Sequence, residues 1–305
     1  MTTYILKRLI QVIPVLLGIT IVAFVLVRLT GDPATIMLPP ETPQETVDAF
    51  RKEYGLDQPV YIQYLQFIGG ALTGDFGKSL RYKEPVSSLF FERLPATLEL
   101  AAGSMAIAIF IGIPIGVLSA IKKNSWLDTI TRFLALFGQA VPSFYLGLML
   151  IMIVAVQWRM LPTGGRGTMA QLALPAITLG VHLLALTARF SRGAVLDVMR
   201  QDYVRTGRAK GLNERLLLMR HIMKNAMIPI VTVIGLQVGA MFSGAVVTET
   251  VFSWPGIGRL MVQAISTRDF PIVQATVMIV ALIFVVVNLL VDLTYAWLDP
   301  RIKYG

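Results

Sequence analysis

The sequence of 305 residues lacks cysteine entirely and has only two histidines, His182 and His221. Without cysteine it forms no disulfide and no thiolate metal site, and two histidines are too few for a histidine-based metal centre. Charge is scarce as well. Only 15% of the residues are charged and the mean hydropathy is +0.68, whereas soluble domains carry about 25% charged residues. These shortages predict a membrane protein without a metal site.

Motifs that mark enzymes are also lacking. The sequence has no HExxH pair, no plausible Ser–His–Asp set and no glycine-rich dinucleotide loop. Gly77-Lys78-Ser79 mimics the end of a phosphate-binding loop, but Leu72 occupies the position where such a loop needs its first glycine. We therefore predict no catalytic residue, no cofactor bound by this chain and no ATPase site of its own.

What the chain does contain is long apolar runs. A helix crosses the bilayer core, about 30 Å thick, with about 20 apolar residues. The runs that meet this length are Leu9–Leu29, Leu98–Ile121, Ile130–Trp158, Leu172–Leu196, Ile228–Phe252 and Ile272–Leu298. No small-residue cleavage pattern follows the first run, so we interpret it as a retained anchor and not as a signal peptide. The predicted fold is an all-α polytopic membrane protein with six transmembrane helices.

Charge predicts the orientation of these helices. With both termini in the cytoplasm, the cytoplasmic pieces are residues 1–8, 122–129, 197–227 and 299–305, in which Lys and Arg outnumber Asp and Glu. The net charge of +9 thus fixes topology and gives little support to nucleic-acid binding. We divide the chain into an anchor (1–29), an extracytoplasmic insert (30–96) and a core (97–305) with a cytoplasmic loop (202–227). Helices are expected in the insert at Gln44–Tyr54 and Val60–Leu72, forming a small cap on the spans.

Residues 202–227 form a basic loop with the pattern of two helices. Asp202 is expected to cap a helix over Tyr203–Lys210, Gly211 to end it in a left-handed conformation, and Asn213 to cap a second helix. Apolar residues recur along the second helix at three- and four-residue spacing: Leu212, Leu216, Met219, Met223 and Met227. Three interpretations fit: a DNA-binding helix-turn-helix, an amphipathic segment on lipid headgroups, and docking to a cytoplasmic motor subunit. The loop is tethered to the bilayer and lacks a third helix, which disfavours the first.

Tyr203–Leu212, followed by Arg220-His221, Asn225-Ala226 and Ile228-Pro229, resembles the coupling loop of ABC-transporter permeases. Peptide and nickel importers carry a variant close to Ala-Arg-Ala-Lys-Gly, and Gly207 replaces its alanine as a more flexible residue. Further resemblances to the same subfamily lie at Gly31–Ala34, Tyr54–Pro59, Gly74–Ser79, Arg93–Thr97, Glu249–Gly258 and Asp299–Arg301. The whole chain is thus similar to the B-type permeases of dipeptide, oligopeptide or glutathione importers, with nickel importers as near relatives.

The resemblance implies a multisubunit machine in a bacterial inner membrane. Its expected partners are a second, similar permease subunit in a heterodimer, two cytoplasmic subunits that hold ATP and Mg, and an external substrate-binding protein, besides membrane lipid. Closure of the ATPases would push the loop as a lever and rock the spans into alternating access. The residues expected to couple are Tyr203, Arg205, Thr206, Gly207, Arg208, Ala209, Lys210, Gly211, Leu212, Asn213, Glu214, Arg215 and Leu216. Basic residues among them would pair with acids on the ATPase or solvate the loop.

Polar groups within the spans are the candidates for the translocation path or its gate, because lipid makes them costly. They are Gln139, Ser143, Gln237, Glu249, Asn288 and Asp292. Structural roles compete with this interpretation. Asp292 is expected to pair with Arg132 or Arg189, and Glu249 either holds the outer gate, contacts a peptide amine or forms a salt bridge.

The predicted spans contain glycine pairs and a proline that are expected to shape their helices. Gly112 and Gly116, and again Gly235 and Gly239, are four residues apart, which places them on one helix face for close packing. Pro142 is expected to kink or begin a helix.

Rival classes fit the sequence less well. An ATP-independent secondary transporter is expected to carry internal repeats and an intramembrane ion site, and neither is evident. An intramembrane enzyme needs converging reactive groups, and a passive structural subunit needs no capped helical pair. Peptide, glutathione included, is the first choice of substrate, and nickel or a nickel chelate is the alternative.

Overall fold

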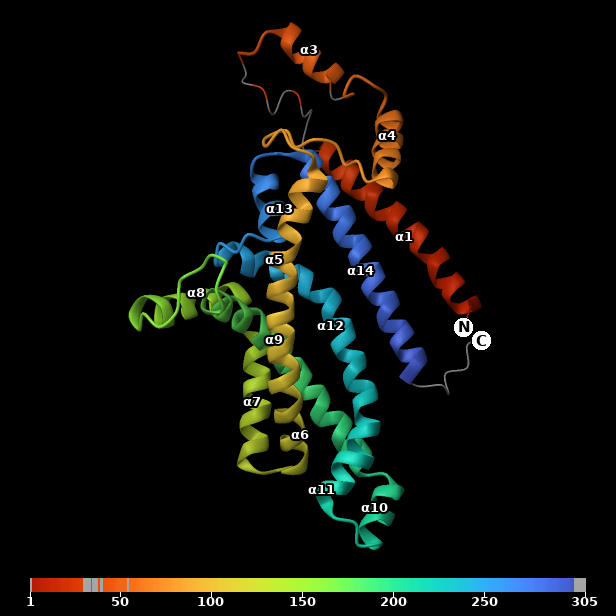
Figure 1. Ribbon diagram of the computed structural model, residues 1–305, viewed down its shortest axis with the longest axis vertical. Coiled ribbons are helices and arrows are strands. Elements are labelled where there is room, and N and C mark those ends of the chain that lie inside the picture. The colour runs from red at the N-terminus through yellow and green to blue at the C-terminus, as the bar shows by residue number, and fades with distance from the viewer. Residues whose placement is uncertain (1, 30–33, 35–37, 39–40, 54, 299–305) are drawn as a thin grey trace. The chain divides into compact units, whose positions relative to one another are not determined.

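Figure 1 shows the computed structural model, which describes residues 2–29, 34, 38, 41–53 and 55–298. Within these ranges the chain is helical apart from turns, loops and one antiparallel bridge between Lys78 and Pro85. The predicted helical class is confirmed. Contacts divide the described chain into two compact units, residues 2–95 with 259–286 and residues 96–258 with 287–298.

The first unit contains the predicted anchor and the insert. Its helices are α1 (Thr2–Leu29), α3 (Gln44–Glu53), α4 (Val60–Thr73), the first part of α5 (Val86–Ile107), most of α13 (Ile257–Ser266) and the first part of α14 (Phe270–Leu298). Both helices expected in the insert are present. The insert rests on α1, as predicted, because Tyr64 contacts the Phe24 ring edge-on at 5.3 Å and its hydroxyl lies 3.0 Å from Thr20 Oγ1.

The triplet Gly77-Lys78-Ser79 belongs to a tight turn in this unit. Asp269 is fully buried, and its carboxylate accepts hydrogen bonds from Ser79 Oγ at 2.5 Å and from the backbone N–H groups of Leu80 and Arg81. The Ser79 hydroxyl and the two backbone N–H groups that follow the triplet are thus paired with a carboxylate of the same chain.

The second unit is organised around one long helix, α9 (Met169–Met199), which contacts most of the others. The remaining elements are the end of α5, the π-helical turn η1 (Ala108–Gly112), α6 (Ile113–Ile121), α7 (Trp126–Ala140), α8 (Ser143–Leu150), the π-helical turn η2 (Ile151–Gln157), α10 (Asp202–Ala209), α11 (Glu214–Leu216), the π-helical turn η3 (Leu217–Ile222) and α12 (Met223–Val251). Gly112 and Gly116 lie against α9, where a Cβ on Gly112 would be 3.1 Å from the Leu184 carbonyl oxygen. Close packing by this pair is confirmed.

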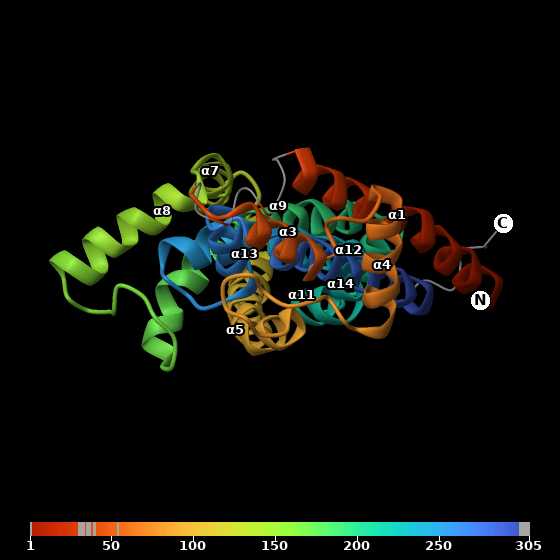
Figure 2. The ribbon, with the colours of Figure 1, turned by 90° about the horizontal axis from the view of Figure 1, so that it is seen from above.

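The expected third span is not a straight helix. Four helical stretches among the described residues are long and apolar enough to cross a membrane, at Val86–Ile121, Met169–Met199, Glu214–Gly239 and Phe270–Leu290, and a fifth crossing is possible if α7 and α8–η2 count as one. These two are bent by 102°, and Figure 2 shows α8 leading away from the end of α7. Pro142 causes the break, since it has no N–H and holds Val141 extended at ψ 124°.

Candidate functional site

The cytoplasmic loop of the sequence analysis forms a compact tip at the ends of α9 and α12 (Figure 1). Its first helix, α10, begins at Asp202, so the prediction that Asp202 is the capping residue was wrong: Gln201 precedes the helix and makes no side-chain cap. The predicted turn is present. Gly211 adopts φ +76°, a conformation that favours glycine, and Asn213 caps α11 by accepting a hydrogen bond from Arg215 N at 2.8 Å.

A salt bridge inside the tip links its two helices. Arg208 donates from Nε to Glu214 Oε1 at 2.7 Å and from Nη2 to Oε2 at 3.3 Å. The hydrogen bonds that the Arg208 guanidinium donates to the Glu214 carboxylate raise the pKa of Arg208 above its usual value. Both side chains are exposed, so solvent screens this pair and it contributes little to stability. Arg208 was expected to pair with an ATPase or to be solvated, and the structure instead pairs it within the chain.

The tip is fixed to the long helices by buried apolar side chains. Val204 and Leu217 are buried in one cluster with Ile222 and Ile230, which lie on η3 and α12. Gly207 is buried beside them, and a Cβ there would lie 2.8 Å from Leu217 Cδ1. Gly207 lies where α10 packs closely against η3, and an alanine there would require the end of the Leu217 side chain to shift.

The predicted apolar stripe is buried only in part: Met223 and Met227 pack against the cluster of Val204 and Leu217, while its first three residues do not. Leu212, Leu216 and Met219 are 36%, 43% and 66% exposed, whereas Leu217 and Ile222 are buried. The π-helical turn η3 explains the difference, because its wider turn separates successive buried residues by five positions instead of four. The exposed stripe leaves an apolar surface on the tip, together with Tyr203, which is 43% exposed. We call these four residues the tip patch.

A buried ion pair connects α9, the helix that leads into the tip, to α7. Asp128 at the start of α7 is fully buried and accepts two hydrogen bonds from Arg192 of α9, at 2.7 and 2.9 Å, and one from Ser119 Oγ of α6 at 2.6 Å. Arg132 lies 3.7 Å from the same carboxylate. Asp128 was not predicted from the sequence. Arg132 was instead expected, with Arg189 as the alternative, to pair with Asp292, whose side chain lies outside the described residues. The spacing of Asp128 and Arg132, one helical turn, was the available signal.

Three of the candidate path residues line one cavity of about 350 Å3 in the second unit. Gln139 and Ser143 lie on either side of the break between α7 and α8, and Gln237 faces them from α12. His182 of α9 also lines this cavity. The structure thus brings together residues that lie up to about a hundred positions apart in the sequence. Asn288 does not line this cavity, and Asp292 lies outside the described side chains.

Glu249, the remaining candidate, is enclosed in a corner at the end of α12. It is fully buried and accepts a hydrogen bond from Thr97 Oγ1 at 2.6 Å, while Thr97 Oγ1 accepts one from Ile257 N at 2.9 Å. Gly256 packs against the carboxylate so tightly that a Cβ would overlap it. Trp254 Nε1 donates to the Ala96 carbonyl in the same corner. The arrangement suits a residue that holds the turn into α13.

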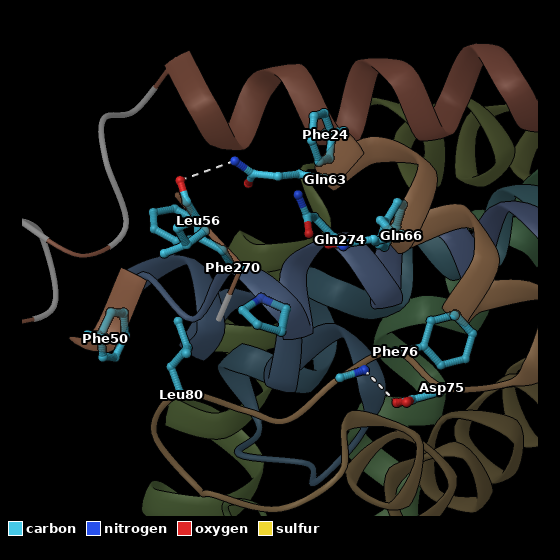
Figure 3. Close-up of a pocket in the computed structure, with 15 residues that line it drawn as sticks. Phe24, Phe50, Leu56, Gln63, Gln66, Asp75, Phe76, Leu80, Phe270 and Gln274 are labelled. Carbon is cyan, nitrogen blue, oxygen red and sulfur yellow. Dashed lines mark hydrogen bonds between the residues drawn. The ribbon is translucent and has the colours of Figure 1, made fainter. Parts of the chain in front are cut away.

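A second cavity, of about 300 Å3, lies in the first unit and differs in character (Figure 3). Aromatic rings such as Phe24, Phe76 and Phe270 form much of its wall. Two of its polar residues serve the fold: Gln63 Nε2 donates to the carbonyls of Leu56 and Gln58, and Asp75 accepts a hydrogen bond from Gly77 N. The amides of Gln66 and Gln274 also line the cavity.

Comparison with known proteins adds to this geometry. The family model of binding-protein-dependent transport system inner membrane components matches residues 112–304, and the model of the N-terminal part of such membrane components matches residues 1–101. The glutathione transport system permease protein GsiC of Escherichia coli (strain K12) is 40% identical over 305 residues, 100% of both chains. GsiC of Salmonella choleraesuis (strain SC-B67) is 41% identical over the same length.

Solved structures share part of the fold. An inward-facing structure of the MetNI methionine ABC transporter aligns with a TM-score of 0.58 at 17% identity, covering 69% of this chain and 96% of the other. The crystal structure of an amino acid ABC transporter with histidines aligns with a TM-score of 0.57 at 17% identity, covering 69% and 94%. At these identities the match shows the fold of the aligned part alone.

Proposed function

Since the chain belongs to the family of binding-protein-dependent transport system inner membrane components, we propose that it moves peptides, glutathione included, through the inner membrane into the cell. It is a permease subunit of an ABC importer. The proposed substrate rests on the relatives of full length that are named for glutathione transport. These names favour a peptide over the nickel alternative.

The proposed complex contains a second permease subunit, two cytoplasmic subunits that hydrolyse ATP and an external substrate-binding protein. In this complex the chain crosses the membrane six times, with α1 as the first crossing and the bent pair α7 and α8–η2 as the third. Both termini and the tip lie in the cytoplasm and the insert outside. The length of α1, 28 residues, and the basic residues around the tip support this topology.

The tip patch is the observation that carries the proposal. An apolar surface on a basic loop is costly in water, and a groove on an ATPase subunit would cover it. The salt bridge, the Gly211 turn and the buried Val204 and Leu217 make the tip rigid, so a push on the patch is passed to α9 and α12 as movement of whole helices. The pair of Asp128 and Arg192 passes the same movement on to α7.

Co-purification of the complex tests this assignment. Met219→Glu places a charge in the tip patch and is expected to reduce recovery of the ATPase subunits at least tenfold. Lys224→Glu is the matched control, because it places the same carboxylate on another exposed face of the same helical segment. Equal recovery of ATPase subunits with both variants would show that the patch is not the docking surface.

A further inference from the structure

The cavity at the α7–α8 break holds polar atoms that have no partner. Among the described residues, five buried side-chain polar atoms make no hydrogen bond, and two of them, Gln139 Nε2 and Gln237 Oε1, belong to walls of this one cavity. Buried polar atoms in proteins are nearly always paired, so each exception calls for an explanation. Two exceptions in one cavity point to a ligand that completes them.

Gln237 is the more constrained of the two. It is 5% exposed, and its amide nitrogen donates to Thr187 Oγ1 at 3.1 Å. A hydroxyl can donate or accept, so rotation of the amide by 180° would pair its oxygen with Thr187 and leave its nitrogen alone. In either orientation one polar atom of Gln237 has no partner, and the orientation with the nitrogen on Thr187 leaves the oxygen as an acceptor.

The break in the helix supplies further polar groups. Pro142 has no N–H, so the Gly138 carbonyl lacks the helical hydrogen bond that it would otherwise accept. Gly138 and Ser143, the first residue of α8, both line the cavity. Interrupted helices of this kind are where backbone groups inside a membrane become available to a solute.

The chemistry of the walls limits what the cavity can hold. Of the described residues that line it, none is Asp, Glu, Lys or Arg, and the apolar part of the wall comes from residues such as Leu146, Leu183 and Met241. His182 is the imidazole among these lining residues, so the described walls hold no side chain with a permanent charge to pair with a charged end group. One amide donor, one amide acceptor and apolar surroundings are instead complementary to a neutral group that carries both an acceptor and a donor, as a peptide bond does.

We propose that this cavity holds the peptide bond of the substrate during translocation, with Gln139 Nε2 donating to the substrate carbonyl and Gln237 Oε1 accepting from the substrate N–H. The site reads the backbone of the peptide and not its side chains, so it suits a permease whose cargo is selected outside. This inference rests on the proposed function and adds to it the group that the permease itself recognises.

The test compares glutathione with its depsipeptide analogue, in which an ester oxygen replaces a peptide N–H. The complete reconstituted transporter is supplied with saturating loaded binding protein, so that the permease step and not the first capture is compared. One neutral hydrogen bond corresponds to about a fivefold difference. The wild-type complex is expected to move the amide about fivefold faster than the ester, and Gln237→Met is expected to bring this ratio close to one.

Ser191→Ala is the matched control, since Ser191 Oγ is another buried atom without a partner, on α9 but outside the walls of this cavity. It is expected to keep the fivefold ratio. The proposal is overturned if the wild type does not distinguish amide from ester, or if Gln237→Met slows both substrates equally. Absence of any transport or substrate-stimulated ATP hydrolysis in the wild type would instead count against the proposed function.

The reciprocal variant guards against a folding failure of Gln237→Met. Gln139→Met removes the donor, and its substrate is a thioamide analogue, whose sulfur accepts a hydrogen bond poorly. The wild type is expected to move the thioamide about fivefold more slowly than glutathione, and Gln139→Met is expected to lose this difference. A difference that persists in the variant contradicts the assignment of Gln139.

Discussion

The tip and the cavity at the α7–α8 break are opposites in how they treat polar and apolar groups. In the tip, Arg208 is paired with Glu214 and Asn213 caps α11, while the apolar tip patch is exposed. In the cavity, apolar side chains form part of the wall, while amide atoms of Gln139 and Gln237 have no hydrogen-bond partner. The tip thus exposes apolar side chains, which is costly in water, and the cavity residues bury amide atoms without hydrogen bonds, which is costly in a protein interior. In our proposal, an apolar surface of a partner protein covers the tip patch, and a polar solute completes the amide atoms of the cavity.

Gly211→Val is expected to have the largest effect, and it acts on the tip alone. A Cβ on Gly211 would meet nothing within 4 Å, so the cost comes only from φ +76°, which a β-branched residue adopts poorly. We expect substrate-stimulated ATP hydrolysis to be abolished while membrane insertion is intact.

Gly211→Asn is the matched control, because asparagine tolerates the left-handed conformation. It is expected to retain most of the stimulated activity. Normal transport by Gly211→Val would contradict the role of the turn.

Asp128→Ala is expected to weaken the connection between the two regions. It leaves the Arg192 guanidinium without its buried partner, which costs about 3 kcal/mol, and it frees the start of α7 from α9. The thermal unfolding of the purified complex should shift downward accordingly. Arg132→Gln removes only the longer, exposed contact of 3.7 Å and should change the midpoint little. Equal shifts of the unfolding midpoint for the two variants would contradict the claim that Arg192 is the main partner of Asp128.

The smallest effect is expected from the salt bridge within the tip. A double-mutant cycle with Arg208→Gln and Glu214→Gln should give a small coupling energy that falls further at high salt, because both side chains are exposed and salt screens them. Thermal unfolding of the complex at low and high salt measures this energy. A large coupling energy that does not change with salt would mean that a partner encloses the pair.

Much of the tip could be predicted from the sequence because its signals are local. Gly211, Asn213 and the lengths of α10 and the two insert helices follow from capping and turn chemistry over a few residues. The face of the second helix could not be predicted, because the π-helical turn η3 changes its period, and nothing in Leu217–Ile222 marks such a turn.

The site residues illustrate the same limit over longer distances. Polarity alone selected Gln139, Ser143 and Gln237, but Glu249 has the same signal and is enclosed by Thr97 and Gly256. Only tertiary contacts separate a polar residue in a cavity wall from one that holds a corner. The break in the third span has a local signal, since Pro142 was expected to kink or begin a helix and α8 begins directly after it. The size of the bend, 102°, could not be predicted.

The most direct test of the account uses the lack of cysteine in the sequence. Met219→Cys, in a complex whose other subunits carry one thiol at the groove of the ATPase, provides a unique crosslinking site in the tip patch. The account predicts that oxidation joins the permease to the ATPase and stops ATP-driven uptake, that reductant restores uptake, and that Lys224→Cys does not crosslink. Full uptake after complete crosslinking, or labelling of the thiol from the outer face of intact cells, would contradict it.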